Sequence, residues 1–203
     1  MEVTLLQMLD ARERRAAAQQ ELIRTHGLPL ICFTMNIAGP VKDSPLIRRG
    51  FEEGCRLLEE ALGRSRIEVP EQHKVREATG CEAFYVVREN AQAVKAICAR
   101  IEDSCPLGRL FDMDVLDEKG GQIRREEVAG GARSCIVCGA PGRGCASRRI
   151  HTVEQLQQAT NRILTEHFQE ADRRRIGSLA LQALLDEVCV TPKPGLVDRA
   201  NSG

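Results

Sequence analysis

The chain has 203 residues, enough for one medium-sized domain or a domain with an appendage, and its 42% hydrophobic content can form a core. Its 29 basic and 29 acidic residues cancel, so no net positive charge favours nucleic acid or an anionic membrane. There is no basic leader before a long apolar stretch, and no segment has the length of a membrane span. We therefore expect a globular cytoplasmic protein, with no nucleic-acid or membrane partner, whose nine cysteines are reduced thiols or metal ligands.

The first half of the chain alternates helical and strand patterns. Apolar residues recur at helical spacing at the start of the chain, and this helix is expected to end near Gly27. A hairpin is expected at Thr79-Gly80. The expected elements are helices over 4–24 and 44–62, and strands over 28–36, 66–69, 74–78 and 82–87.

The second half continues in the same way, with a turn at Lys119-Gly120-Gly121 between two strands. The expected elements are helices over 90–104, over 152–168 and from Ile176 onward, and strands over 110–116 and 122–127. This order predicts an α+β fold, in which a mixed sheet is flanked by helices and followed by a Cys-rich loop and C-terminal helices.

Two aspartates lie two residues apart in the strand expected over 110–116. Alternate side chains of a strand share a face, so Asp112 and Asp114 would project together while Phe111, Met113 and Val115 face the core. Such a pair can bind Mg²⁺ and leave its other positions to water and substrate phosphates. The alternative is a solvated strand end without a catalytic role.

The turn between the first strand and the second helix has features of a phosphate site. Gly39 allows close backbone approach, Lys42 offers an ammonium group, and Arg48 lies one turn inside the helix. The alternative is an ordinary loop in which Asp43 or Ser44 caps the helix. Arg109, directly before the aspartate strand, is a further candidate for a phosphate contact, or else a surface arginine.

A cysteine cluster follows in Gly- and Arg-rich sequence. Cys135 and Cys138 have the spacing of a zinc knuckle, and Cys145 with His151 would complete a Cys₃His site for Zn²⁺. The alternatives are reduced cysteines that pack a compact loop, or a basic phosphate-binding strip.

Several of these motifs, in this order, resemble the citrate lyase holo-acyl-carrier-protein synthases, also called apo-citrate lyase phosphoribosyl-dephospho-CoA transferases (the CitX family), over about residues 5–168. The strand with Asp112 and Asp114 after a helix also resembles the nucleotidyltransferase fold, although Arg88-Glu89-Asn90 replaces the usual Gly-Ser turn. The motifs that carry the family resemblance are Arg-Glu-Arg-Arg with Gln19-Gln20, Phe33-Thr34, residues 39–44, Arg48-Arg49 with Phe51 and Gly54, residues 106–115, and the Cys and His series.

The resemblance implies transfer of the 2′-(5″-triphosphoribosyl)-3′-dephospho-CoA group to a serine of the citrate lyase acyl carrier (gamma) subunit, with release of pyrophosphate. Asp112 and Asp114 would then hold Mg²⁺, and one of them, or Asp117, would assist deprotonation of the serine. Lys42, Arg48 and Arg109 would hold phosphates. The alternatives are another nucleotidyltransferase, including one that modifies the malonate decarboxylase carrier, or a zinc-stabilised binding module.

The C-terminal sequence differs from the rest. Residues 191–203 are rich in Pro and Gly and resemble the opening of triphosphoribosyl-dephospho-CoA synthase (CitG), which is fused to the transferase in CitXG proteins. We therefore expect a transferase domain over 1–170 and a truncated start of a synthase-like domain over 171–203, which forms a helix and a flexible tail after Cys189 and is too short for synthase activity.

Overall fold

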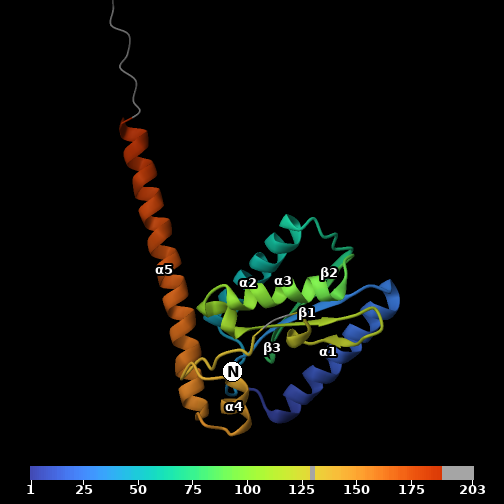
Figure 1. Cartoon of the computed structure of the whole chain (residues 1–203). Coiled ribbons are helices and arrows are strands. Elements are labelled where there is room, and N and C mark those ends of the chain that lie inside the picture. The colour runs from blue at the N-terminus through green and yellow to red at the C-terminus, as the bar shows by residue number, and fades with distance from the viewer. Residues whose placement is uncertain (129–130, 189–203) are drawn as a thin grey trace, which may run out of the picture. The chain divides into compact units, whose positions relative to one another are not determined.

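The computed structural model describes residues 1–128 and 131–188, and the side chains among them except at positions 143, 146 and 175–188. Figure 1 shows a sheet with helices on its faces. The helices are α1 (Leu5–His26), α2 (Pro45–Arg64), α3 (Ala91–Asp103), α4 (Gly142–Ser147) and α5 (Val153–Val188); the strands are β1 (Leu30–Met35), β2 (Glu71–Glu77), β3 (Gly80–Val86), β4 (Phe111–Leu116) and β5 (Gln122–Ile123); the 3₁₀ turns are Pro106–Leu110 and Arg125–Val128.

The sheet has the strand order β2-β3-β1-β4-β5, and each of these pairings is antiparallel. The α+β class is confirmed, but the strand directions are not mixed, because hairpins and α-helical connections return each strand against its neighbour. The nucleotidyltransferase likeness stays a prediction. The described residues contain no helix with the length and apolarity needed to cross a bilayer.

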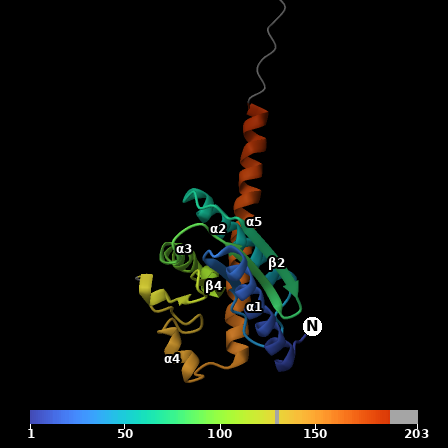
Figure 2. The same cartoon turned by 90° about the vertical axis from the view of Figure 1, so that its right-hand side faces the viewer.

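Helices cover opposite faces of the sheet. Leu22 and Ile23 of α1 pack against Leu30 and Cys32 of β1 on one face. On the other face Phe33 of β1 meets α2, and the β4 strand meets α3. Figure 2 shows α1 and α2 from a second direction. The alternation of β1 therefore buries both of its faces.

Local sequence signals set the helix ends. Thr4 and Gln7 form a capping box at the start of α1, and Gly27 ends that helix with a left-handed φ of 60°. Ser44 Oγ accepts a hydrogen bond from the Ile47 N–H at the start of α2. The expected bounds of these two helices are confirmed to within a few residues.

Four of the expected elements differ from the structure. Residues 66–69 form no strand, since Arg66 takes a left-handed φ of 55° and the chain turns before β2 begins at Glu71. The strand expected over 122–127 pairs only at Gln122–Ile123, after which a 3₁₀ turn begins. The two expected C-terminal helices are one helix, α5, because the intervening arginines are good helix formers.

The chain divides into two compact units, Met1–His167 and Phe168–Gly203. The first contains the whole sheet with α1 to α4, and the second contains the C-terminal part of α5. The tail expected after Cys189 lies outside the described residues. The division at 170 into a transferase domain and a synthase-like start stays a prediction.

Two glycines of α2 give a matched test of this packing. A Cβ at Gly54 would lie 2.4 Å from Phe33 Cζ, whereas a Cβ at Gly63 would meet nothing within 4 Å. Phe33 has little freedom to move because it stacks on Phe51 and meets Phe111 edge-on. We expect Gly54→Ala to lower the free energy of unfolding by about 1–3 kcal/mol and Gly63→Ala to raise it by up to about 1 kcal/mol, measured by urea denaturation. Equal effects of the two substitutions would contradict this packing.

Candidate functional site

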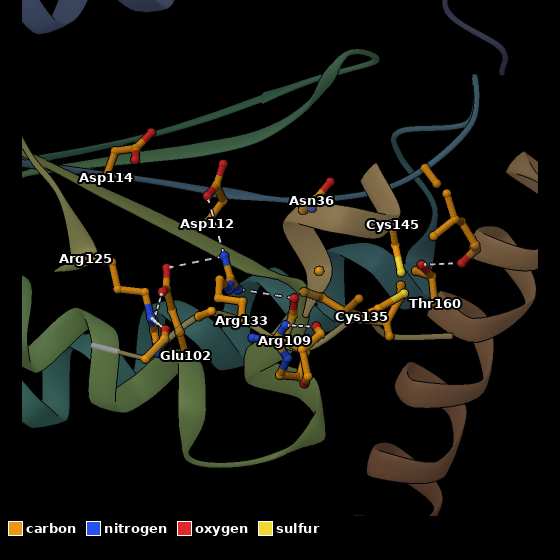
Figure 3. Close-up of a pocket in the computed structure, with 18 of the residues that line it drawn as sticks. Asn36, Glu102, Arg109, Asp112, Asp114, Arg125, Arg133, Cys135, Cys145 and Thr160 are labelled. Atoms are coloured by element: carbon orange, nitrogen blue, oxygen red, sulfur yellow. Dashed lines mark hydrogen bonds and ion pairs between the residues drawn. The ribbon is translucent and has the colours of Figure 1, made fainter. Parts of the chain in front are cut away.

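A cavity of about 970 Å³ opens beside β4 within the first compact unit. This volume lies at the upper end of the range of small-molecule sites. Its walls come from β4, α3, the segment after residue 131 and the start of α5, as Figure 3 shows. The charged residues of its lining include Lys95, Glu102, Arg109, Asp112, Asp114, Arg125 and Arg133.

Asp112 and Asp114 reach the cavity from one face of β4. Burial alternates along the strand, with Phe111, Met113 and Val115 fully buried and the aspartates partly exposed. The sequence-based expectation about the direction of these side chains is thus confirmed. Their catalytic role is a separate matter and stays a prediction.

Asp114 is close enough to affect the ionisation of Asp112. Burial, together with the negative charge of Asp114, raises the pKa of Asp112 above its usual value, and Arg133 opposes this shift. Asp112 Oδ1 lies 3.8 Å from Arg133 Nη1, and Asp114 Oδ1 accepts a 2.7 Å hydrogen bond from Gln122 Nε2. A divalent cation would relieve the repulsion between two carboxylates on one face, so these residues fit Mg²⁺.

Side chains occupy the outer edge of β4 where β5 does not reach. Because β5 pairs only with Val115 and Leu116, the polar backbone groups further back along β4 need other partners. Glu102 accepts from the Met113 N–H at 2.9 Å, and Lys95 Nζ donates to the Met113 carbonyl at 2.8 Å. Arg133 Nη2 donates to the Phe111 carbonyl at 2.5 Å. These contacts hold Glu102, Lys95 and Arg133 against β4, in the same cavity as Asp112 and Asp114.

Glu102 is the most deeply buried carboxylate of the site. Its side chain is 3% exposed and forms a 2.8 Å ion pair with Arg125 Nη1. Burial raises the pKa of Glu102, and the positive charges of Arg133, Lys95 and Arg125 oppose that shift. Arg125 also pairs with Asp103, so one guanidinium joins the end of α3 to the turn after β5.

Four residues of the site were not predicted from the sequence: Lys95, Glu102, Arg125 and Arg133. One signal was available, because Lys95 and Glu102 are seven residues apart on α3 and therefore share a helix face. Charged residues beside an apolar stripe indicate a buried polar contact. No comparable local signal marks Arg133, whose partners lie more than twenty residues away.

The residues predicted for phosphate binding separate into two groups. Arg109 lines the cavity and donates to the Ser134 carbonyl. Burial, then the nearby charge of Arg133, lowers the pKa of Arg109. Two neighbouring guanidinium groups in one cavity favour an anionic ligand.

Gly39 and Lys42 lie in the turn after β1, and Arg48 lies in the first turn of α2; none of the three is among the described residues that line this cavity. Gly39 has a φ of 82°, and the Gln157 side chain packs against it. Lys42 donates to the Ile37 carbonyl, and burial lowers its pKa. Arg48 pairs with Asp43, so its charge already has a partner. Their predicted phosphate contacts remain untested.

The cysteine cluster assembles as its spacing indicates. The ligand atoms of Cys135, Cys138, Cys145 and His151 lie within 4.8 Å of one another. Cys138 Sγ is 3.5 Å from Cys145 Sγ and 3.3 Å from His151 Nε2. A tetrahedral zinc site with Zn–S bonds of about 2.3 Å separates its ligand atoms by roughly 3.6–3.8 Å. The four residues can therefore hold a metal ion, and the cluster borders the cavity.

The backbone around Cys135 supports a metal-binding thiolate. The Val137 N–H points at Cys135 Sγ over 3.5 Å, and Gly139 closes the turn with a left-handed φ of 74°. Burial raises the pKa of Cys135, but backbone hydrogen bonds from Cys138 and Val137, together with hydrogen bonds from the Cys138 and Cys145 side chains, lower the pKa overall. A lowered thiol pKa favours the form that binds metal.

Comparison with known proteins matches the chain to two families, one over residues 3–167 and one over its C-terminal segment. The family model of apo-citrate lyase phosphoribosyl-dephospho-CoA transferase (CitX) matches residues 3–167. The family model of ATP:dephospho-CoA triphosphoribosyl transferase (CitG) matches residues 173–203.

Individual relatives agree with these matches. Protein CitXG of Haemophilus influenzae is 33% identical over 202 residues, which are 99% of this chain and 43% of that protein. Protein CitXG of Leuconostoc mesenteroides is 30% identical over 99% of this chain and 44% of that protein. The apo-citrate lyase phosphoribosyl-dephospho-CoA transferase of Escherichia coli is 30% identical over 81% of this chain and 90% of its own length. The chain thus spans less than half the length of the CitXG relatives, and it belongs to the apo-citrate lyase phosphoribosyl-dephospho-CoA transferase family.

Proposed function

We propose that the chain transfers the 2′-(5″-triphosphoribosyl)-3′-dephospho-CoA group to a serine of the citrate lyase acyl carrier (gamma) subunit and releases pyrophosphate. The observation that carries this proposal is one cavity in which two adjacent carboxylates face two arginines. In such a transfer the serine oxygen attacks the α-phosphorus of the donor, and the bond from that phosphorus to the pyrophosphate oxygen breaks. Family membership indicates the donor and the acceptor.

The positive side chains of the cavity supply the phosphate contacts. Arg109 and Arg133 lie beside the carboxylates of β4. Their guanidinium groups would bind the oxygens of the departing pyrophosphate and stabilise its growing negative charge. Asp112 and Asp114 would hold Mg²⁺, which supplies charge neutralisation when bound.

The carboxylates also provide a base for the acceptor serine. The raised pKa of Asp112 makes it a stronger proton acceptor than an ordinary aspartate. Asp117 is less suited to this task, because its Oδ1 already accepts the N–H groups of Lys119 and Gly121. We therefore assign proton removal to Asp112 or Asp114.

We further propose that Cys135, Cys138, Cys145 and His151 hold Zn²⁺. Three thiolates and one imidazole at tetrahedral spacing are a ligand set that zinc prefers, and a site with four protein ligands leaves no open position for substrate. Its role would be to stabilise the loop. Titration with Co²⁺ would report tetrahedral thiolate coordination by its visible absorption, which should be lost in Cys138→Ser.

The transferase is tested by the mass of the carrier. The full chain is incubated with Mg²⁺, the triphosphoribosyl-dephospho-CoA donor and apo-carrier, and intact carrier is followed by mass spectrometry. We expect a mass gain equal to the prosthetic group and the release of pyrophosphate. Replacement of the donor by ATP or CTP is the control, since equal transfer from either would indicate a general nucleotidyltransferase. A carrier that gains no mass would overturn the proposal.

A further inference from the structure

Arg133 lies in the same segment as Cys135 and Cys138, the first two cysteines of the metal-binding cluster. Only Ser134 separates Arg133 from Cys135, and the backbone around it is fixed by hydrogen bonds of the turn that carries the cluster. The Gly142 N–H donates to the Arg133 carbonyl at 2.7 Å, and the Cys135 N–H donates to the Ala140 carbonyl at 2.7 Å. Ser134 and Pro141 form an isolated antiparallel bridge between these bonds. The cluster and the Arg133 backbone are therefore one local unit.

The side chain of Arg133 extends from this unit to the aspartate strand. Besides its bond to Phe111, Arg133 Nη2 donates to the Arg109 carbonyl at 3.2 Å, while Arg109 donates back to the Ser134 carbonyl. The guanidinium points toward Asp112, as Figure 3 shows. In the described part of the chain, the buried Nε atoms of Arg109 and Arg133 have no hydrogen-bond partner. The pair thus retains donor capacity for an anion.

Little regular structure holds this segment in place. Between residue 131 and the start of α5, the described elements are the isolated bridge and the six-residue helix α4. A helix this short and a single bridge are not stable by themselves. Metal coordination orders such segments, because four ligands joined to one ion replace a hydrophobic core.

We infer that metal bound at Cys135, Cys138, Cys145 and His151 positions Arg133 to bind the pyrophosphate half of the donor, so that donor binding depends on an occupied metal site. The identity of the donor rests on the proposed function. The coupling itself rests on the Arg133 contacts and the cluster geometry. The cluster residues are positioning residues, and Arg133 is the one that touches the ligand.

The experiment uses the full chain loaded with one Zn²⁺, verified by elemental analysis, and inorganic pyrophosphate with Mg²⁺ as the probe. Affinity is measured by calorimetry for wild type, Arg133→Gln and Arg148→Gln, each before and after zinc removal by a chelator that is then dialysed away. Arg148 is an exposed arginine of the same segment that does not line the cavity, so its variant is the matched control. Circular dichroism verifies that the helices and sheet persist after zinc removal, and Cys138→Ser provides a chelator-free version.

We expect Arg133→Gln to weaken pyrophosphate binding about 10- to 100-fold, the usual contribution of a charge-assisted contact, with zinc content unchanged. Zinc removal should weaken wild-type binding by a similar factor and have little further effect on Arg133→Gln, because the two changes remove the same contact. Arg148→Gln should behave as wild type in both states.

Fully additive effects of zinc removal and Arg133→Gln would overturn the inference, as would unchanged binding after zinc removal or absence of bound metal. The carrier mass assay separates this result from the proposed function. Transfer without zinc-coupled pyrophosphate binding would contradict only the inference. Zinc-coupled binding without transfer to the carrier would contradict only the assigned reaction.

Discussion

Asp112→Asn is expected to reduce transfer to the carrier at least about 100-fold, the scale of loss when a group that stabilises developing charge is removed. The amide keeps the size of the side chain but supplies neither the negative charge that a cation needs nor a useful base. Intact mass of the carrier, followed over time, measures the rate. Glu118→Gln is the matched control, because it removes one exposed carboxylate of the turn after β4 that does not line the cavity.

The same substitution should not destabilise the fold. Since burial and Asp114 raise the pKa of Asp112 above its unfolded value, folding favours the protonated form, and that stabilisation is lost as pH rises through the folded pKa. At neutral pH the neutral Asn should therefore leave the free energy of unfolding unchanged or higher. A large loss of stability in Asp112→Asn would indicate instead that the ion pair with Arg133 is structural.

The pH dependence of transfer follows from the same shift. The proposed role needs ionised Asp112, so at limiting Mg²⁺ activity should fall as pH is lowered through its raised pKa, at a higher pH than for an ordinary aspartate. Saturating Mg²⁺ should move this fall to lower pH, because the cation favours the ionised carboxylate. If activity at limiting Mg²⁺ instead falls at the pH of an unperturbed carboxylate, Asp112 is not the titrating group.

Much of the candidate site could be predicted because its signals are local. The two-residue spacing of Asp112 and Asp114 determines their common face wherever the strand lies in the sheet. The knuckle spacing of Cys135 and Cys138 likewise predicts proximity, and chain reversal brings Cys145 within reach. These predictions need only the periodicity of an element or the geometry of a turn.

The rest depends on contacts between distant segments. Whether the outer edge of β4 is paired depends on how far β5 extends, and the sequence pattern of 122–127 predicted a longer strand than the structure has. Because β5 is short, Glu102 and Lys95 of α3 form the hydrogen bonds with the Met113 backbone at this edge of β4. Similarly, Arg48 was predicted to contact phosphate, but its guanidinium pairs with Asp43. Sequence spacing does not determine which side chains form such an ion pair.

The edge contacts predict a second large effect. Glu102→Ala should lower the free energy of unfolding by about 3–5 kcal/mol, the usual cost of breaking a buried ion pair from one side. The change removes the acceptor for the Met113 N–H and the partner of Arg125, whose own side chain is only 12% exposed. Thermal unfolding should register a decrease of roughly 10 °C.

The neighbouring Asp103 provides the control for this prediction. It pairs with the same guanidinium of Arg125, but its side chain is 52% exposed, against 3% for Glu102. Asp103→Ala should therefore cost only about 0–1 kcal/mol, as exposed ion pairs usually do. Glu102→Gln should lie between the two, because its amide oxygen still accepts from Met113 while the charge pairing is lost. Equal costs for Glu102→Ala and Asp103→Ala would mean that water, not Glu102, satisfies the edge of β4, and that the alignment of Arg133 with Asp112 does not depend on this carboxylate.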